Sequence, residues 1–227
     1  EQKLTYGELD QQVRAIAARL QESRLDGQRV LLLYAPGLDY IAAFLGCMYA
    51  GVVAIPAYPP RNNQSLLRLQ MIHADAQAAA ILSTSLIKAR AELLFDEVPA
   101  LKILPWITTD TLDNCLAAAW TPPQIDGRSL VFLQYTSGST ALPKGVMVSH
   151  RNLLHNEECI RQLFQQTEDS IIVGWLPFYH DMGLIGNVLQ PLYAGATCVL
   201  MSPMAFLQRP FRWLQAISKY GGTTSGG

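Results

Sequence analysis

The sequence predicts an α/β fold in which mostly parallel strands form layered sheets flanked by helices. Short continuous apolar runs, typical of strands buried in parallel sheets, recur along the chain, as in residues 30–33. Longer segments with helical spacing of apolar residues lie between them, so strands and helices alternate. Of the 227 residues, 50% are hydrophobic and 15% are charged, which suffices for one large domain or two small ones.

The first half of the chain carries clear helix boundaries. Thr5 and Glu8 have the S/T-x-x-E spacing of a capping box, which predicts a helix that runs to about Glu22. Gly51 is placed to end a second helix. We expect helices over 38–50 and 66–74, strands over 30–33, 52–55 and 78–82, then a helix, a strand and a loop to about Trp106. Residues 108–127 form the least regular segment.

The second half continues the alternation. Residues 130–133 and 146–148 are two apolar runs that flank a polar loop, and we expect both to be buried strands. Pro210 is suited to the first turn of a helix. We expect further helices over 150–166, 184–193 and 210–219, and strands over 171–173 and 196–200.

Composition excludes several classes of protein. The formal net charge is -1 and the basic residues are scattered, so we expect no nucleic-acid surface. The four cysteines lie far apart without a C-x-x-C pair, which predicts reduced, mostly buried thiols in a cytosolic protein rather than a disulfide framework or a zinc site.

Two uncharged stretches are long enough for a membrane helix, which needs about 20 residues. Residues 40–60 and 182–208 are both interrupted by glycine and proline. A helix followed by a buried strand explains each stretch better, so we expect no membrane span.

The stretch from Tyr135 to Gly145 reads Y-T-S-G-S-T-A-L-P-K-G and follows a predicted strand. Glycine lets backbone N–H groups approach an anion closely, and hydroxyl and ammonium groups add further donors. A flexible linker with a solvated lysine is the alternative, but a linker has no reason to lie between two apolar runs. Gly138 and Lys144 do not have the spacing of the common P-loop. The stretch therefore predicts a different kind of phosphate cradle.

At these residues the sequence resembles the adenylate-forming (ANL) superfamily, whose signature is close to Y-T-S-G-S-T-G-x-P-K-G. Ala141 stands where the family usually has glycine. Residues 4–9 are similar to the family's opening L-T-Y-x-E-L, and residues 46–56 to its G-x-x-x-A-G-x-x-x-x-P element. The three matches occur in the family's order, which favours membership.

Within the superfamily, the run W-L-P-F-Y-H-D-M-G-L-I-G at 175–186 resembles the fatty acyl-AMP ligases, as do P-A-Y-P-P at 56–60 and Gln134. A lone His180 outside this context would be an ordinary surface or core residue. The uncharged stretch after it fits the wall of an acyl tunnel, and ordinary core packing explains that stretch equally well.

The resemblance implies an enzyme that uses ATP and Mg²⁺ to convert a fatty acid into an acyl-adenylate, with release of pyrophosphate. The acyl group would then pass to the phosphopantetheine thiol of an acyl carrier protein. A fatty acyl-CoA synthetase or an amino-acid adenylation domain is the alternative within the class. A non-catalytic, truncated adenylation fold used as a binding module is the alternative from another class.

The resemblance also implies roles for individual residues. The β- and γ-phosphates are assigned to Thr136, Ser137, Gly138, Ser139, Thr140 and Lys144. His180 would lie near the substrate carboxylate and the α-phosphate, so His180 and Lys144 are the expected catalytic residues. The start of the acyl pocket is assigned to His180, Met182, Gly183 and Leu184, and the border of the adenylate to Ser225 and Gly226. Asp181 either orients His180 or forms a simple cap.

We expect residues 1–227 to be part of the large N-terminal AMP-binding domain of a longer, cytoplasmic protein. The rest of that domain and the C-terminal lid domain would lie outside this chain. The family's magnesium-site glutamate, ribose-binding aspartate and late lysine have no counterpart here. No metal ligand can therefore be assigned with certainty, and we expect the chain alone to be inactive.

Overall fold

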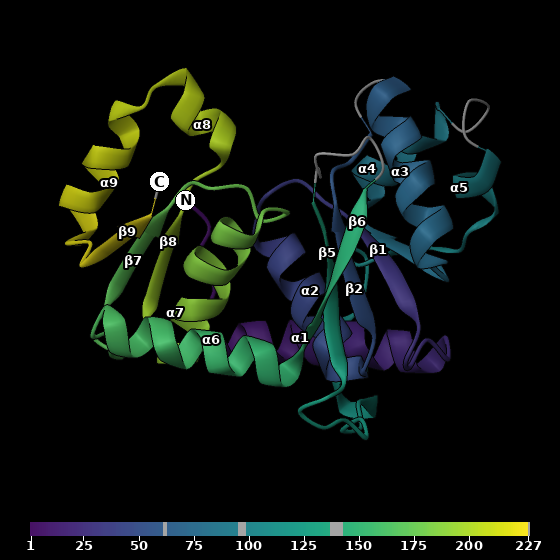
Figure 1. Ribbon diagram of the computed structural model, residues 1–227, viewed down its shortest axis with the longest axis horizontal. Helices are drawn as coiled ribbons and strands as arrows, with labels where there is room; N and C mark the ends of the chain where they lie inside the picture. Colours follow the sequence, from purple (N-terminus) through teal and green to yellow (C-terminus); the bar gives the residue numbers. More distant parts are fainter. Residues whose placement is uncertain (61–62, 95–98, 137–142, 227) are drawn as a thin grey trace. The chain divides into compact units, whose positions relative to one another are not determined.

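The structure, a computed structural model, describes residues 1–60, 63–94, 99–136 and 143–226 (Figure 1). The chain divides into two compact units, Glu1–Ser149 and His150–Gly227. Each unit has its own sheet, so each is described by itself.

Within the described part of the first unit, six strands form one sheet in the order β4-β3-β1-β2-β5-β6. All neighbouring strands are parallel except β5 and β6, which form an antiparallel hairpin. The strands are β1 (Arg29–Leu33), β2 (Val53–Ala57), β3 (Ala80–Ser83), β4 (Trp106–Thr108), β5 (Leu130–Thr136) and β6 (Lys144–Ser149).

Helices cover both faces of this sheet (Figure 1). Leu133 belongs to the core cluster formed with α3, whereas the ring of Phe132 lies 5.6 Å from that of Phe44 in α2. Consecutive strand residues point to opposite faces, so α2 and α3 cover opposite sides. The helices are α1 (Tyr6–Glu22), α2 (Leu38–Ala50), α3 (Asn63–Ala76), α4 (Ser85–Glu92), α5 (Pro99–Ile103) and the 3₁₀ helix η1 (Asn114–Ala119).

The predicted helix boundaries of this unit have the expected physical causes. The Thr5 side chain accepts a hydrogen bond from the Glu8 N–H while Glu8 binds the Thr5 N–H, a complete capping box. Gly51 has φ +68°, the left-handed conformation that ends α2. The capping box and this terminal glycine are therefore confirmed.

The second unit contains a parallel sheet of order β8-β7-β9 in the part of the chain that the structure describes. Its strands are β7 (Ile171–Gly174), β8 (Thr197–Leu200) and β9 (Thr224–Gly226). Its helices are α6 (His150–Leu163), the π-helix η2 (Met182–Leu189), α7 (Gln190–Ala194), α8 (Pro203–Gln208) and α9 (Phe211–Tyr220).

Two predictions about burial are wrong. The strand after the polar loop is an exposed edge strand, with Val146 at 51% and Met147 at 69% exposure, because no further strand covers it among the described residues. Among the cysteines, Cys47 is buried, but the other three positions (Cys115, Cys159, Cys198) are exposed.

The two long uncharged stretches fold as expected into alternating helices and strands. Residues 40–60 contain most of α2 and then β2, and residues 182–208 contain η2, α7, β8 and α8. Among the described residues, no helix combines the length and the apolar character needed to cross a bilayer.

Candidate functional site

The hairpin β5–β6 carries the two described ends of the predicted phosphate loop. Thr136 pairs with Lys144 at the end of the ladder, one position beyond the pair of Tyr135 and Gly145. Thr136 and Lys144 are both exposed, so the hairpin brings a hydroxyl and an ammonium group to the end of a buried strand. The loop residues between them (Ser137, Gly138, Ser139, Thr140) lie outside the described residues.

The end of β5 lies at the edge of the sheet where ligands bind in open α/β folds. Strand β5 is parallel to β2, so Thr136 and the ends of the other parallel strands lie at the carboxyl edge of the sheet. In such sheets, loops at that edge form the ligand sites. The position of the hairpin is therefore compatible with a phosphate site.

His180 lies in the second unit, at the exposed end of the segment that connects β7 to η2. Its Nδ1 lies 2.6 Å from Asp181 Oδ1, and the same oxygen accepts a hydrogen bond of 2.7 Å from the Met182 N–H. Asp181 therefore both orients the imidazole and caps η2, so the two alternatives for this residue are compatible. With Nδ1–H directed to the carboxylate, the ring presents Nε2 to solvent or to a ligand.

The three residues after Asp181 differ in exposure. Met182 is 56% exposed, whereas Leu184 is fully buried in the core of the second unit. A Cβ on Gly183 would lie 2.2 Å from the Pro177 carbonyl oxygen, so the chain can make this turn only with glycine. His180 and Met182 are thus the members of this group with surface available to a ligand.

Ser225 and Gly226 form β9 with Thr224, beside β7. The Ser225 hydroxyl donates to the Val173 carbonyl over 2.7 Å and accepts from Trp213 Nε1 over 2.8 Å. Its hydrogen bonds fix β9 to β7 and to α9, so Ser225 has a clear structural function whatever it contacts in a complex.

Asn187 in η2 is a buried polar residue at this edge that sequence reasoning missed. It is 2% exposed, and its Nδ2 has no hydrogen-bond partner among the described residues. A Cβ on Gly174 would lie 2.4 Å from Asn187 Cγ, and a Cβ on Gly226 would lie 3.4 Å from Asn187 Oδ1. Asn187 therefore packs its amide against the paired ends of β7 and β9. Helical periodicity does not distinguish such an amide from any other buried position.

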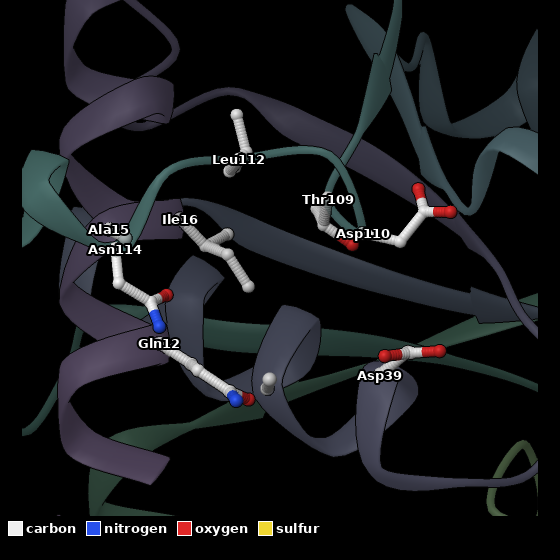
Figure 2. A pocket seen from close by; sticks show the side chains of 9 residues that line it. Gln12, Ala15, Ile16, Asp39, Thr109, Asp110, Leu112 and Asn114 are labelled. Atoms are coloured by element: carbon white, nitrogen blue, oxygen red, sulfur yellow. The ribbon is translucent and has the colours of Figure 1, made fainter. Parts of the chain in front are cut away.

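The first unit also contains a cavity of about 260 Å³ (Figure 2). Asp39 comes from the start of α2 and Asp110 from the segment after β4 (Figure 2). Burial and the nearby Asp110 carboxylate raise the pKa of Asp39. The lining residues are Gln12, Ala15, Ile16, Asp39, Ala42, Thr109, Asp110, Leu112 and Asn114. None of the predicted site residues that the structure describes lines this cavity.

Metal ligands are not evident in the described ranges. No group of three or more His, Cys, Asp or Glu side chains could hold a metal ion there.

The predicted residues fall into two sets. Thr136 and Lys144 belong to the first unit, and His180, Ser225 and Gly226 belong to the second. Thr136, Ser225 and Gly226 lie at the carboxyl ends of parallel strands, and His180 lies in the segment that follows such a strand. Lys144 begins the antiparallel strand β6 and is paired with Thr136 at the same edge. This repeated arrangement defines an α/β protein with candidate ligand-binding loops at the sheet edges.

The family of AMP-binding enzymes matches residues 1–227. The chain therefore belongs to the AMP-binding enzyme family, and the resemblance to the adenylate-forming superfamily is confirmed. The predicted α/β fold is confirmed as well, since the structure superposes on solved members of that class.

Two of the similar proteins are fatty-acid ligases. The chain is 47% identical over 231 residues to the medium-chain-fatty-acid–acyl-carrier-protein ligase JamA of Moorena producens (strain JHB), covering 99% of this chain and 38% of that protein. It is 36% identical over 224 residues to the long-chain-fatty-acid–AMP ligase FadD32 of Mycolicibacterium smegmatis, covering 98% and 35% respectively.

A solved structure of the same class is also similar. The fatty acyl-adenylate ligase from Legionella pneumophila, in complex with acyl adenylate and pyrophosphate, matches with a TM-score of 0.90 and 44% identity. The match covers 100% of this chain and 39% of that one. The chain thus spans less than two fifths of the length of these relatives. The resemblance to fatty acyl-AMP ligases is confirmed.

Proposed function

We propose that this chain is part of the large N-terminal AMP-binding domain of a cytoplasmic ligase that activates a fatty acid with ATP. The product is an acyl-adenylate, and the acyl group then passes to the phosphopantetheine thiol of an acyl carrier protein. One observation carries the proposal: the chain is 44% identical over its whole length to a ligase solved with acyl adenylate and pyrophosphate. Similarity to a ligase named for an acyl carrier protein supports the proposed acceptor.

The first half-reaction joins two anions. A carboxylate oxygen forms a bond to the α-phosphorus of ATP, and the bond from that phosphorus to the bridging oxygen breaks, leaving its electrons on pyrophosphate. Catalysis requires groups that are placed in advance to offset the charge on the departing pyrophosphate. In the second half-reaction the thiol sulfur attacks the acyl carbon and AMP departs.

In this proposal the phosphate cradle consists of Thr136, Ser137, Gly138, Ser139, Thr140 and Lys144, with Lys144 supplying a positive charge to the β- and γ-phosphates. Its exposure at the start of β6 supports this role, because the ammonium group is accessible to a ligand. A bound Mg²⁺ ion would offset further phosphate charge, and we assign none of its ligands to this chain.

His180 orients the fatty carboxylate against the α-phosphate. Asp181 holds the ring at Nδ1, so Nε2 is the ring atom that faces the substrate oxygens. Met182, Gly183 and Leu184 form the start of the acyl pocket, and Ser225 and Gly226 border the adenylate. Met182 offers exposed surface to an acyl chain, whereas Leu184 shapes the pocket from within the core.

The proposed activity is tested on the full-length protein by detecting acyl-AMP by mass spectrometry and by measuring ATP–pyrophosphate exchange. We expect acyl-AMP with at least one fatty acid, and transfer to a phosphopantetheinylated carrier protein. Efficient formation of acyl-CoA with free coenzyme A would instead identify a fatty acyl-CoA synthetase. A protein that forms no adenylate with any fatty acid or amino acid would be a binding module.

Two substitutions test the assigned residues. Lys144→Ala and His180→Ala should each slow adenylate formation by about 10²- to 10³-fold, because each removes a charge-stabilising donor. Lys3→Ala and His155→Ala are matched controls on exposed residues outside the proposed site and should retain the wild-type rate. Circular dichroism checks that each variant is folded. Wild-type rates in Lys144→Ala and His180→Ala would reject the assignment of Lys144 and His180 as catalytic residues.

A further inference from the structure

Tyr135, the residue at the start of the loop sequence, is hydrogen-bonded to helix α3. It is 7% exposed, and its hydroxyl donates to Asp75 Oδ2 over 2.5 Å. Asp75 lies in the last turn of α3, 60 residues earlier in the chain. The bond therefore connects the strand that enters the loop to a helix that packs on the sheet.

Gly145, on the opposite strand of the hairpin, leaves room for the Tyr135 ring. The two residues are paired across β5 and β6. A Cβ on Gly145 would lie 2.9 Å from Tyr135 Cζ and 3.1 Å from its hydroxyl oxygen. The ring thus lies across a backbone that carries no side chain. The hydroxyl can reach Asp75 from this position because nothing at Gly145 displaces it.

In the hydrogen bond between Tyr135 and Asp75, the tyrosine hydroxyl is the donor and the carboxyl oxygen is the acceptor. Burial and then the hydrogen bond to Asp75 raise the pKa of Tyr135 well above 10, so the hydroxyl remains a donor at neutral pH. The acceptor is a carboxyl oxygen of Asp75, and hydrogen bonds to carboxylates are stronger than those between neutral groups. The next pair along the hairpin is Thr136 with Lys144. A constraint on Tyr135 is therefore transmitted over one residue to the groups proposed to bind phosphate.

We propose that Asp75 is a positioning residue: through Tyr135 it holds the stem of the β5–β6 hairpin so that Lys144 meets the ATP phosphates in one geometry. The inference rests on the proposed function. Asp75 itself contacts neither substrate nor nucleotide. Asp75 affects the reaction through the position of Lys144, because a small displacement of a catalytic group lowers the rate considerably.

A merely structural role and a positioning role give different results in a double variant. Asp75→Ala leaves a buried hydroxyl without its acceptor, which destabilises the fold, whereas removing both partners is nearly neutral. The double variant Asp75→Ala/Tyr135→Phe should therefore be more stable than Asp75→Ala. If Asp75 only maintains the fold, ATP use recovers together with stability. If Asp75 positions the stem, ATP use stays impaired.

The experiment uses the full-length protein and compares Asp75→Ala, Tyr135→Phe, the double variant and a control. The control is Tyr49→Phe, because the Tyr49 hydroxyl also donates to an aspartate, Asp10, over 3.1 Å, but between α1 and α2. ATP–pyrophosphate exchange gives kcat and KM for ATP and for the fatty acid, thermal unfolding gives stability, and calorimetry gives the Kd of ATP.

We expect kcat/KM for ATP to fall about tenfold in both single variants, as for the loss of one charged hydrogen bond. In the double variant kcat/KM for ATP should also fall about tenfold, because both substitutions remove the same hydrogen bond, whereas independent effects would multiply. The KM for the fatty acid should not change in any variant, and Tyr49→Phe should have wild-type kinetics. Wild-type ATP kinetics in Asp75→Ala, or recovery in the double variant, would overturn the inference. If the wild-type protein forms no adenylate, the proposed function fails. The inference about Asp75 is then decided by calorimetry, and a Kd of ATP that is the same in wild type and Asp75→Ala would overturn it.

Discussion

Glu157 on α6 is a buried carboxyl group. It is 2% exposed, and its Oε1 has no hydrogen-bond partner among the described residues. With the Gln190 amide turned so that its nitrogen faces Glu157, that nitrogen donates to Glu157 Oε2 over 2.5 Å and to the Glu157 carbonyl oxygen over 3.0 Å. Burial raises the pKa of Glu157 to about 8, which favours the neutral carboxyl.

This carboxyl makes stability depend on pH. The ordinary pKa is 4.5, so between pH 4.5 and about 8 the folded state holds a proton that the unfolded state has released. The free energy of unfolding should therefore fall as pH rises, by up to about 1.4 kcal/mol per pH unit. Glu157→Gln should remove this slope. Urea unfolding followed between pH 5.5 and 8.5 measures it.

Glu158 provides the matched control for that experiment. Its hydrogen bonds from Arg161, Gln162 and Tyr193 lower its pKa to about 2. A lowered pKa contributes stability that is lost only as pH falls below the ordinary value, so Glu158→Gln should leave the slope between pH 5.5 and 8.5 unchanged. An identical slope in wild type and Glu157→Gln would contradict the neutral carboxyl.

Single residues were predictable where a motif places them close together in the sequence. Thr136 and Lys144 lie within one continuous stretch, and the structure pairs them across a hairpin. Asp75 and Asn187 could not be predicted, because the contacts that make them interesting join distant segments and leave no local periodicity. Residues expected to contact the substrate could therefore be predicted from a local motif, whereas residues that position other residues through distant contacts could not.

Elements with local boundary signals were predicted best. Helix α2 begins at Leu38 and ends at Ala50 as expected, because its terminal glycine acts locally. The segment 184–193 was expected as one helix, but it lies in a π-helix followed by α7. Helix α8 and strand β9 were not expected, since each is too short to show a period. The exposure of β6 could not be predicted, because an apolar run does not show whether a strand lies at the edge of a sheet.

The capping box of α1 gives a prediction at this scale. Thr5→Ala removes the side-chain acceptor at the helix start and should destabilise the first unit by about 1 kcal/mol. Thr5→Ser keeps a hydroxyl in the same position and should restore most of that stability. Urea unfolding of the two variants at constant m-value measures the difference. Equal midpoints for the alanine and serine variants would show that the cap contributes little.

For the whole chain, alternation of strands and helices predicted the fold class but not how it divides. The length allowed one large domain or two small ones, and the structure divides at Ser149 and His150. The antiparallel pairing of β6 was not predicted either, although the connection over residues 137–143 is shorter than the dozen or so residues that a parallel crossover needs. The order of the strands in each sheet is a different matter, because it depends on pairings between distant segments that leave no local pattern in the sequence.

Burial is distributed unevenly between the two units, and this predicts uneven local stability. Strands β1 and β3 consist almost entirely of buried residues. Within the described residues, α8 and α9 have no buried side chain, and Phe211 and Leu214 are each more than half exposed. Local opening costs least where few apolar contacts must be broken. In the 227-residue chain, amides of α9 should therefore exchange with deuterium orders of magnitude faster than those of β1, as measured by mass spectrometry of peptides. Protection of α9 equal to that of β1 would mean that its hydrogen bonds open only with the whole fold, and that its own contacts do not set its stability.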